Sequence, residues 1–291
     1  MLDIKFIREN KDLVKDAARK KHIEFDVEKL LVADDKRKAL SQEVDEKNRE
    51  KNLAAEKRDI EAGKRIKGEL EGLETGLKEA MKEWQGLMLL APNIPDVSVP
   101  EGDSDAENKE VKKWGEPTKF DFEPKNHIEI MTALDMADFE RGVKVAGFRG
   151  YFLKNAGALL ELAIWQYAQR FFMDKGLTPI IAPSLVRREP FMGTGFLPQS
   201  EDDIYKVQDD LYLAGTAEVP IMGYHMNEVL SQAELPKRYV GFSPCFRREI
   251  GAHSKDVKGL IRVHEFFKVE QVVLCEATHE ESVKWHEWLH K

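Results

Sequence analysis

The chain has 291 residues, of which 42% are hydrophobic and 34% are charged, and its formal net charge is −8. This length exceeds the usual size of a single hydrophobic core, so two domains are the default expectation. No stretch approaches the roughly 18 apolar residues of a membrane-spanning helix, and the N-terminus mixes acids with bases where a signal peptide would be apolar. We therefore expect a cytoplasmic protein with no membrane partner. Its acidic balance argues against indiscriminate nucleic-acid binding but leaves room for a local basic patch.

Residues 27–90 are predicted to form a long helical hairpin. The segment contains no proline and is dense in Glu, Lys, Ala, Leu and Arg, which are strong helix formers. Its second half has apolar residues at intervals of three and four, the spacing of a coiled-coil seam: Ile66, Leu70, Leu73, Leu77, Met81, Trp84 and Met88. Its first half carries a looser stripe: Ala33, Leu40, Val44 and Ala54. Because Gly63 can turn or end a helix, we expect two antiparallel helices that meet near residues 60–63.

The far end of this hairpin is basic. Helices of about 28 residues are about 42 Å long, so the hairpin should form an arm. Between residues 47 and 67 there are eight basic and four acidic residues. A basic arm end on an acidic protein favours contact with nucleic-acid phosphates, and a solvated charged face is the alternative.

A linker is expected at residues 91–118, where prolines and acidic residues interrupt the helical pattern. A second domain follows, with a helix predicted at 159–175 and a strand at 177–186. Later segments near 211–215, 238–250 and 260–276 alternate apolar and polar residues, as strands of an antiparallel sheet do. The fold class is therefore α+β. Neither GxGxxG nor GxxxxGK[ST] occurs, so a Rossmann or P-loop nucleotide site is not indicated.

The segment 244–270 contains the residues best suited to chemistry. If its two strands are antiparallel and alternate regularly, Arg247 and Glu249 share a face, as do Arg262, Phe266 and Glu270. An arginine can bind a phosphate through two parallel hydrogen bonds, an aromatic ring can stack on a purine, and a glutamate can accept from an amine. A surface ladder of ion pairs across the two strands is the alternative interpretation.

Five ordered segments resemble the seryl-tRNA synthetases, a family of class II aminoacyl-tRNA synthetases. FRRE at 246–249, GLIR at 259–262 and FFKVE at 266–270 look like the second class II motif in its seryl form. GTAEVP at 215–220 is similar to the serine-binding loop of the family. GTGFLP at 193–198 and LTPIIAPSLV at 177–186 match further segments, the latter resembling the dimer-forming first motif. The fifth match is APNIP at 91–95, followed by the linker EVKKWGEP at 110–117. The resemblance covers nearly the whole chain. It implies an N-terminal tRNA-binding domain with a coiled-coil arm (1–90), a linker (91–118) and an antiparallel-sheet catalytic domain (119–291).

The resemblance also implies the role of each site residue by its position. It places serine binding at Thr216, Ala217, Glu218, Arg247 and Glu270. It places ATP binding at Arg247, Arg248, Glu249, Arg262, Val263 and Phe266. Arg247 would be the catalytic residue that bridges the serine carboxylate and the α-phosphate. The basic arm residues expected to bind tRNA are Lys57, Arg58, Lys64 and Arg65.

The activity implied is that of a serine-tRNA ligase. Serine would react with ATP and Mg²⁺ to give seryl-adenylate and pyrophosphate, and the serine would then pass to the serine tRNA, with the selenocysteine tRNA as an open second acceptor. A homodimer is implied as well. The chain ends before a segment resembling the third class II motif, so the magnesium ligands are expected beyond residue 291. A non-catalytic tRNA-binding or regulatory derivative is the alternative.

Overall fold

The computed structural model describes residues 2–250 and 259–290. The chain divides into two compact units, Met1–Pro117 and Thr118–Lys291. Part of the loop that was predicted between the two strands of segment 244–270 lies outside the described residues.

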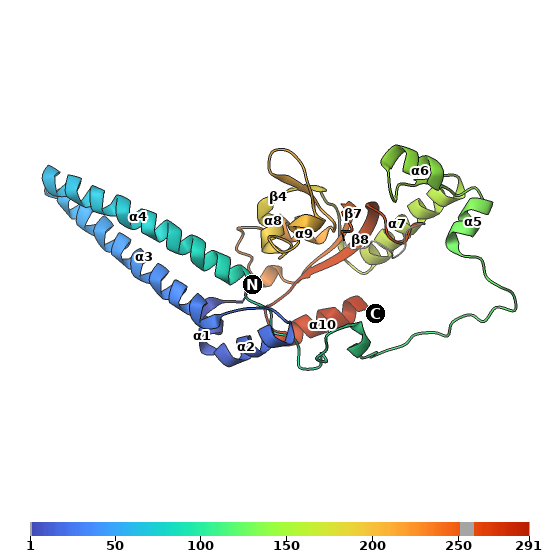
Figure 1. Ribbon diagram of the computed structural model, residues 1–291, viewed down its shortest axis with the longest axis horizontal. Helices are drawn as coiled ribbons and strands as arrows, with labels where there is room; N and C mark the ends of the chain where they lie inside the picture. The colour runs from blue at the N-terminus through green and yellow to red at the C-terminus, as the bar shows by residue number, and fades with distance from the viewer. Residues whose placement is uncertain (1, 251–258, 291) are drawn as a thin grey trace. The chain divides into compact units, whose positions relative to one another are not determined.

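The first unit is helical and is dominated by a hairpin of two long helices, α3 (Val27–Glu56) and α4 (Ile60–Leu89). They are preceded by α1 (Ile4–Glu9) and α2 (Lys11–Lys20), and a short 3-10 helix η1 (Asp105–Glu107) follows. The side chains of Asp26 and Asp59 accept hydrogen bonds from backbone amides in the first turns of α3 and α4, so both long helices begin at an N-cap. Figure 1 shows the two helices side by side along their length.

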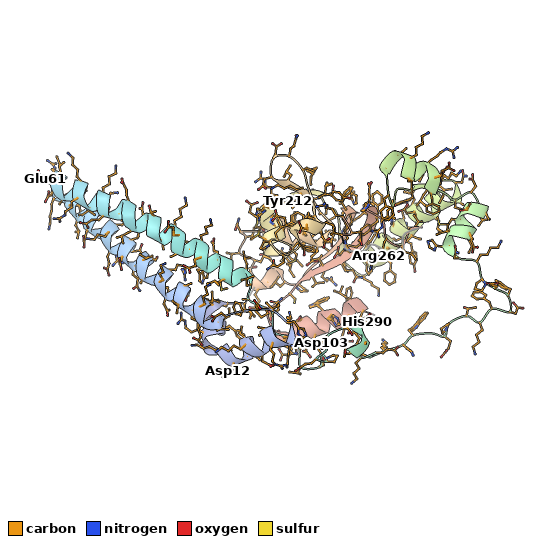
Figure 2. All side chains as sticks on the ribbon, viewed as in Figure 1. Asp12, Glu61, Asp103, Tyr212, Arg262 and His290 are labelled. Atoms are coloured by element: carbon orange, nitrogen blue, oxygen red, sulfur yellow. The ribbon has the colours of Figure 1, made fainter. Side chains whose placement is uncertain are left out.

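The turn of the hairpin lies earlier than predicted. It spans residues 57–59, where Arg58 has a positive φ of 58°, and Gly63 lies inside α4. The prediction placed the turn at the glycine. The Asp59 side chain, four residues before Gly63, instead caps α4, because it satisfies an amide that a helix start leaves without a partner. Glu61, labelled in Figure 2, therefore lies at the outer end of the hairpin.

The seam of the hairpin is apolar, as the spacing predicted. Val44 and Ala54 of α3 pack with Ile66 and Leu70 of α4 in a buried cluster. Towards the other end of the hairpin, Met88 joins a second buried core with residues of the two short helices and the start of α3: Ile7, Val14, Val27, Leu30 and Leu31. Met81 was wrongly placed in the seam. It is 40% exposed, and Ala80 is buried instead.

A buried carboxylate connects α1 to α3 in the first unit. The Asp34 side chain is fully buried and accepts from Arg8 at 2.9 Å and from Arg37 at 2.7 Å, while the Lys38 ammonium lies 2.6 Å away. Burial raises the pKa of Asp34, but the hydrogen bonds from the three cations outweigh burial and lower that pKa to about 2. The guanidinium of Arg37 also stacks over Trp84 of α4, 4.5 Å from the ring centroid.

The second unit combines helices with short and long strands. Its elements before residue 200 are α5 (His127–Ala133), β1 (Ala137–Asp138), α6 (Phe139–Ala146), β2 (Phe152–Leu153), α7 (Ala156–Asp174), β3 (Thr178–Ile181), β4 (Leu185–Arg187) and α8 (Arg188–Gly193). Those after it are η2 (Glu201–Asp203), β5 (Tyr205–Lys206), β6 (Leu211–Leu213), α9 (Glu218–Tyr224), η3 (Gln232–Glu234), β7 (Lys237–Phe246), β8 (Glu265–Leu274) and α10 (His279–His290). The expected α+β fold is confirmed.

The long strands β7 and β8 form the centre of the larger sheet. They pair antiparallel over their whole length, and the strand order is β3-β7-β8. The α7 helix covers one face, where Trp165 packs 5.2 Å from Phe242 and 4.5 Å from Phe267 between ring centroids. A second small sheet has the order β4-β6-β5.

The strand predicted at 177–186 is two strands in two sheets. β3 pairs with β7 and is parallel to it, an exception to the antiparallel pattern. Pro183 has no N–H to continue that ladder. The Ser184 carbonyl accepts instead from Ala214, just after β6, and β4 then pairs with β6. The proline therefore marks the point where the chain passes from one sheet to the other.

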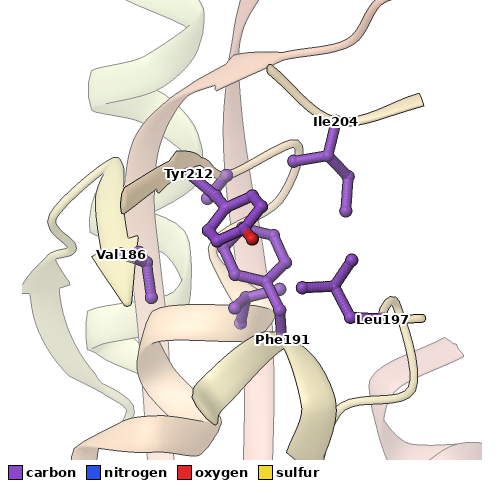
Figure 3. Packing of buried hydrophobic residues seen from close by; sticks show 7 residues of the cluster. Val186, Phe191, Leu197, Ile204 and Tyr212 are labelled. Atoms are coloured by element: carbon purple, nitrogen blue, oxygen red, sulfur yellow. The ribbon is translucent and has the colours of Figure 1, made fainter. Parts of the chain in front are cut away.

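A compact core lies beside the small sheet. Figure 3 shows the rings of Phe191 and Tyr212 against each other, with Val186, Leu197 and Ile204 around them. The two ring centroids are 5.6 Å apart, and both residues are at most 1% exposed. Phe191 belongs to α8 and Tyr212 to β6, so this core joins the segment 193–198 to the strand that leads into the 215–220 loop.

Candidate active site

Three of the side chains that form the site project from one face of β8. Phe266, Lys268 and Glu270 are spaced two apart in a regular strand and therefore point the same way. Their partners across the ladder, in the same order, are Cys245, Ser243 and Gly241. α7 covers the opposite face of the strand pair, so the face with the polar residues belongs to the candidate site.

The loop at 215–220 and the helix that follows lie over this face. A Cβ at Gly241 would lie 2.2 Å from Cδ1 of Ile221 and 3.2 Å from Cβ of Ala217, so α9 packs directly on the backbone of β7. The backbone N–H of Phe246 donates to the carbonyl of Ala214 at 3.0 Å. These two attachments hold the 215–220 loop against the strand pair.

The strands are shorter than the prediction required. β7 ends at Phe246 and β8 begins at Glu265, so Arg247, Glu249 and Arg262 lie in the segments beyond the strands. Regular alternation does not govern these segments, and Glu249 has a positive φ of 52°. The inference that alternation places these three side chains on common strand faces was therefore wrong, although they still approach one another.

Glu249 and Arg262 form an ion pair. The Arg262 Nη1 atom donates to Oε2 of Glu249 at 3.1 Å. A second cation, Nη1 of Arg149, lies 4.0 Å from the same oxygen, and the Arg149 side chain is only 2% exposed. The carboxylate of Glu249 is thus held between a buried guanidinium and a more exposed one.

Arg247 lies between the loop and the aromatic ring. Its Nε and Nη2 atoms both donate to the carbonyl of Gly215 at 3.3 Å, and its guanidinium carbon lies 5.3 Å from the ring centroid of Phe266. A Cβ at Gly215 would lie 3.1 Å from the Phe246 carbonyl, so a glycine permits this close approach. The guanidinium is exposed, and it keeps donors that can turn to an anion.

Thr216 is the centre of a polar cluster below this arginine. Its hydroxyl lies 2.5 Å from Oε2 of Glu270 and donates to it, and the hydroxyl accepts from Nζ of Lys268 at 2.7 Å. The backbone N–H of Glu218 donates to the same hydroxyl at 3.3 Å. Lys268 also lies 2.8 Å from Oε2 of Glu270. Threonine, lysine and glutamate from two distant segments therefore form one network.

Two carboxylates face this network. Burial raises the pKa of the Glu218 carboxyl, the negative charge of Glu270 raises it further, and the nearby Lys268 opposes both. A site with two carboxylates and one ammonium has an excess negative charge when both acids are ionised. Such a site suits a ligand with an ammonium group and small hydrogen-bonding substituents.

A cavity of about 400 Å³ adjoins the charged residues. Its lining includes Arg247, Glu249 and Arg262 together with Phe191 of α8 and Phe196 of the 193–198 segment. The volume falls in the range of small-molecule sites, which combine apolar walls with a few polar groups.

The other predicted site residues have different surroundings. Ala217 is fully buried in a cluster with Ile221 and Tyr239, and Val263 is 6% exposed, so their side chains serve packing. Arg248 is exposed, and its backbone N–H donates to the Asp203 carbonyl. Sequence reasoning missed two residues that the fold brings in. Regular alternation in FFKVE could have identified Lys268, whereas no local pattern singled out Arg149.

The magnesium ion implied by the resemblance has no ligand set in the described part of the chain. No group of three or more His, Cys, Asp or Glu side chains there could hold a metal ion. In the same residues, no helix is long and apolar enough to cross a membrane.

The antiparallel strand pair, with its arginine, glutamate and phenylalanine, defines a class II aminoacyl-tRNA synthetase core. Residues 203–287 match the family model described as the tRNA synthetase class II core domain (G, H, P, S and T). Residues 1–95 match the seryl-tRNA synthetase N-terminal domain.

The comparisons with whole proteins specify the family. The chain is 45% identical over 300 residues to a serine--tRNA ligase of Deinococcus radiodurans, covering 99% of this chain and 71% of that protein. A seryl-tRNA synthetase from Pyrococcus horikoshii, solved with ATP, matches with a TM-score of 0.84 and 36% identity over 99% of this chain and 72% of that one. A cytoplasmic serine-tRNA ligase from Naegleria fowleri, solved with AMP, matches with a TM-score of 0.81 and 30% identity over 99% and 70%. The chain belongs to the serine--tRNA ligase family.

Proposed function

We propose that the chain activates L-serine with ATP and transfers it to the serine tRNA. The observation that carries this proposal is the network that Thr216 forms with Lys268 and Glu270. These two residues share a face of β8 with Phe266, and the Arg247 guanidinium lies over the Phe266 ring. One end of this face suits a small amino acid with a hydroxyl and an ammonium group. The other end suits a nucleotide. The hypothesis of a non-catalytic derivative is not favoured, because the relatives are ligases by name.

The nucleotide end would bind ATP in three ways. Phe266 would stack beneath the adenine, and Glu249 would accept a hydrogen bond from the exocyclic amine. Arg262 would move from its ion pair with Glu249 towards the phosphates. Arg247 would leave the Gly215 carbonyl and bridge the α-phosphate and the serine carboxylate, because its two parallel donors match either anion.

The first reaction is attack of a serine carboxylate oxygen on the α-phosphorus. A new bond forms between that oxygen and the α-phosphorus, and the bond from the α-phosphorus to the bridging oxygen breaks. Pyrophosphate leaves with the bonding electron pair, and seryl-adenylate remains. The protein contributes mainly position and charge neutralisation, since the two anions must approach each other. A terminal ribose hydroxyl of the tRNA then attacks the serine carbonyl, and AMP leaves.

The hairpin would bind the tRNA through its basic end. Lys57, Arg58 and Lys64 form no ion pair with any residue in the ranges 2–250 and 259–290, and Arg65 lies 3.8 Å from Glu69. Exposed cations of this kind suit phosphate contacts and recognition of RNA shape. We place the tRNA-binding domain at 1–90, the linker at 91–118 and the catalytic domain at 119–291.

A homodimer is the proposed assembly. Apolar side chains on α7 and β3 are exposed to an unusual degree: Leu159 at 68%, Ile164 at 56%, Tyr167 at 72% and Ile181 at 82%. Contiguous exposed apolar surface of this kind marks an interaction site in many soluble proteins. We also propose a cytoplasmic location and magnesium as the companion of ATP.

Serine-dependent exchange of pyrophosphate into ATP tests the proposal. Exchange should occur with serine, fall by at least about 100-fold with alanine, which lacks the hydroxyl, and disappear in Glu270→Ala. Glu265→Ala is the matched control, because Glu265 lies on the same strand with its side chain on the opposite face. Exchange by Glu270→Ala at the control rate would remove the carboxylate from the serine pocket. A chain that binds tRNA but never exchanges pyrophosphate would support the non-catalytic alternative.

A further inference from the structure

The hydroxyl of Thr216 has its hydrogen-bonding capacity fully used. It donates its one proton to Glu270, and it accepts from Nζ of Lys268 and from the backbone N–H of Glu218. A threonine hydroxyl has one donor and two acceptor positions. An amino-acid ammonium can bond to this oxygen only if one of the two present donors leaves it.

Of these two donors, only Lys268 can leave at low cost. The amide of Glu218 belongs to the first turn of α9, which packs on the backbone of β7 at Gly241. The Lys268 side chain is 31% exposed and has four rotatable bonds, so its ammonium can move while the strand stays in place. Lys268 therefore occupies the position that the substrate ammonium requires.

The displaced ammonium would find a new anion close by. In an α-amino acid the carboxylate is bonded to the carbon that carries the ammonium, which places a carboxylate oxygen about 3 Å from the ammonium nitrogen. An amino acid whose ammonium takes the Lys268 position on Thr216 and Glu270 thus brings a carboxylate within reach of Lys268. The ion pair between Lys268 and Glu270 is lost. Two ion pairs replace it, one between the ligand ammonium and Glu270 and one between the ligand carboxylate and Lys268, so no charge is left without a counter-ion.

We propose that Lys268 is a specificity residue that selects α-amino acids over simple amines. Its ammonium competes with every amine for Thr216 and Glu270. Only a ligand that also carries a carboxylate gives the displaced Lys268 ammonium a new ion pair. This inference rests on the proposed serine-binding function, which includes Lys268 in the network but does not make it a determinant of ligand choice.

The prediction is tested with two ligands that differ only in the carboxylate. L-serine and ethanolamine both carry an ammonium and a hydroxyl group, and only serine has the carboxylate. Their dissociation constants are measured by isothermal titration calorimetry for the unmodified chain, Lys268→Met and Lys237→Met. Lys237 is the matched control, because it pairs with Glu234 at the start of the neighbouring strand. Circular dichroism verifies that each variant folds.

The two ligands should respond to Lys268→Met in opposite directions. Serine binding should weaken by about tenfold, since one charged contact is lost. Ethanolamine binding should strengthen by about threefold or more, since its competitor for Glu270 is gone. Lys268→Arg, which keeps a cation, should retain most of the preference for serine, and Lys237→Met should change neither ligand.

Two different failures are distinguishable. If the unmodified chain binds serine and Lys268→Met weakens both ligands by the same factor or changes neither, Lys268 only supports the fold of the pocket and the inference is overturned. If the unmodified chain binds neither ligand, the proposed function fails and the inference falls with it.

Discussion

Replacing the buried carboxylate of the first unit should strongly destabilise the base of the hairpin. Asp34→Asn keeps the size of the side chain but leaves Arg8, Arg37 and Lys38 without the anion on which they converge. The pKa of Asp34 falls from 3.8 to about 2 in the folded chain. A difference of this size corresponds to about 2 kcal/mol of stability near neutral pH, and the crowding of three cations raises the expected loss to about 2–4 kcal/mol.

The neighbouring acid provides a matched control. Asp35 also binds Arg8, at 2.6 Å, but its side chain is 63% exposed. Solvent screens such a pair, so Asp35→Asn should cost less than about 1 kcal/mol. Hydrogen exchange measured by mass spectrometry on peptides of α1 and α3 reports the stability of this region separately from the second unit.

The pH dependence has a definite sign. Because the folded pKa of Asp34 lies below its ordinary value, its contribution is complete above about pH 4 and is lost as the pH falls towards 2. Asp34→Asn should therefore differ from the unmodified chain at pH 7 and converge with it at the acid end. Equal losses for Asp34→Asn and Asp35→Asn at pH 7 would refute the claim that burial makes the Asp34 network strong.

Four further outcomes follow from the site and the arm. Replacing Lys57, Arg58, Lys64 and Arg65 with glutamate should weaken tRNA binding and flatten its salt dependence, which filter binding at several salt concentrations measures. The rate of pyrophosphate exchange should stay within about twofold of that of the unmodified chain. Because burial raises the pKa of Glu218 above its ordinary value, serine affinity should increase as the pH rises through that pKa, and Glu218→Gln should remove this pH dependence in a calorimetric titration series. Gly241→Val should force α9 outward at Ile221. The free energy of unfolding should fall by about 1–3 kcal/mol, and serine binding should weaken. Arg149→Met should weaken ATP binding by about tenfold and leave serine binding unchanged, because it removes one of the two cations that hold Glu249.

The hairpin was predictable because its determinants are local. Helix formers without proline and a seam of three- and four-residue steps are visible within one stretch of sequence. The error at Met81 shows the limit of that signal. Leu77 and Trp84 are seven residues apart, and either Ala80 or Met81 can lie between them at steps of three and four. The spacing alone therefore does not decide which of these two residues belongs to the seam. In the structure Ala80 is buried and Met81 is exposed.

The site was predictable where its residues belong to regular strands and not where they belong to loops. Phe266 and Glu270 share a face because β8 is regular between them. Glu249 adopts a left-handed conformation beyond the end of β7, so the period of two did not apply to it. Arg149 also has a positive φ, of 63°, and it reaches Glu249 only through the folded chain. No sequence pattern encodes such a contact.

The two faces of the β7–β8 pair have different surroundings, and the proposed serine pocket depends on both. On one face, Trp165 of α7 packs against Phe242 and Phe267 and fixes the strands with apolar contacts. The other face packs against α9 at Tyr239, Gly241 and Val272, and beside this apolar contact it carries charged groups at two-residue intervals. Attack of a carboxylate on a phosphate needs such groups already in place, because reorienting them during the reaction would cost part of the stabilisation that they provide. The aromatic packing on the far face is thus a condition for the polar network around Thr216, although no aromatic residue of that face touches it.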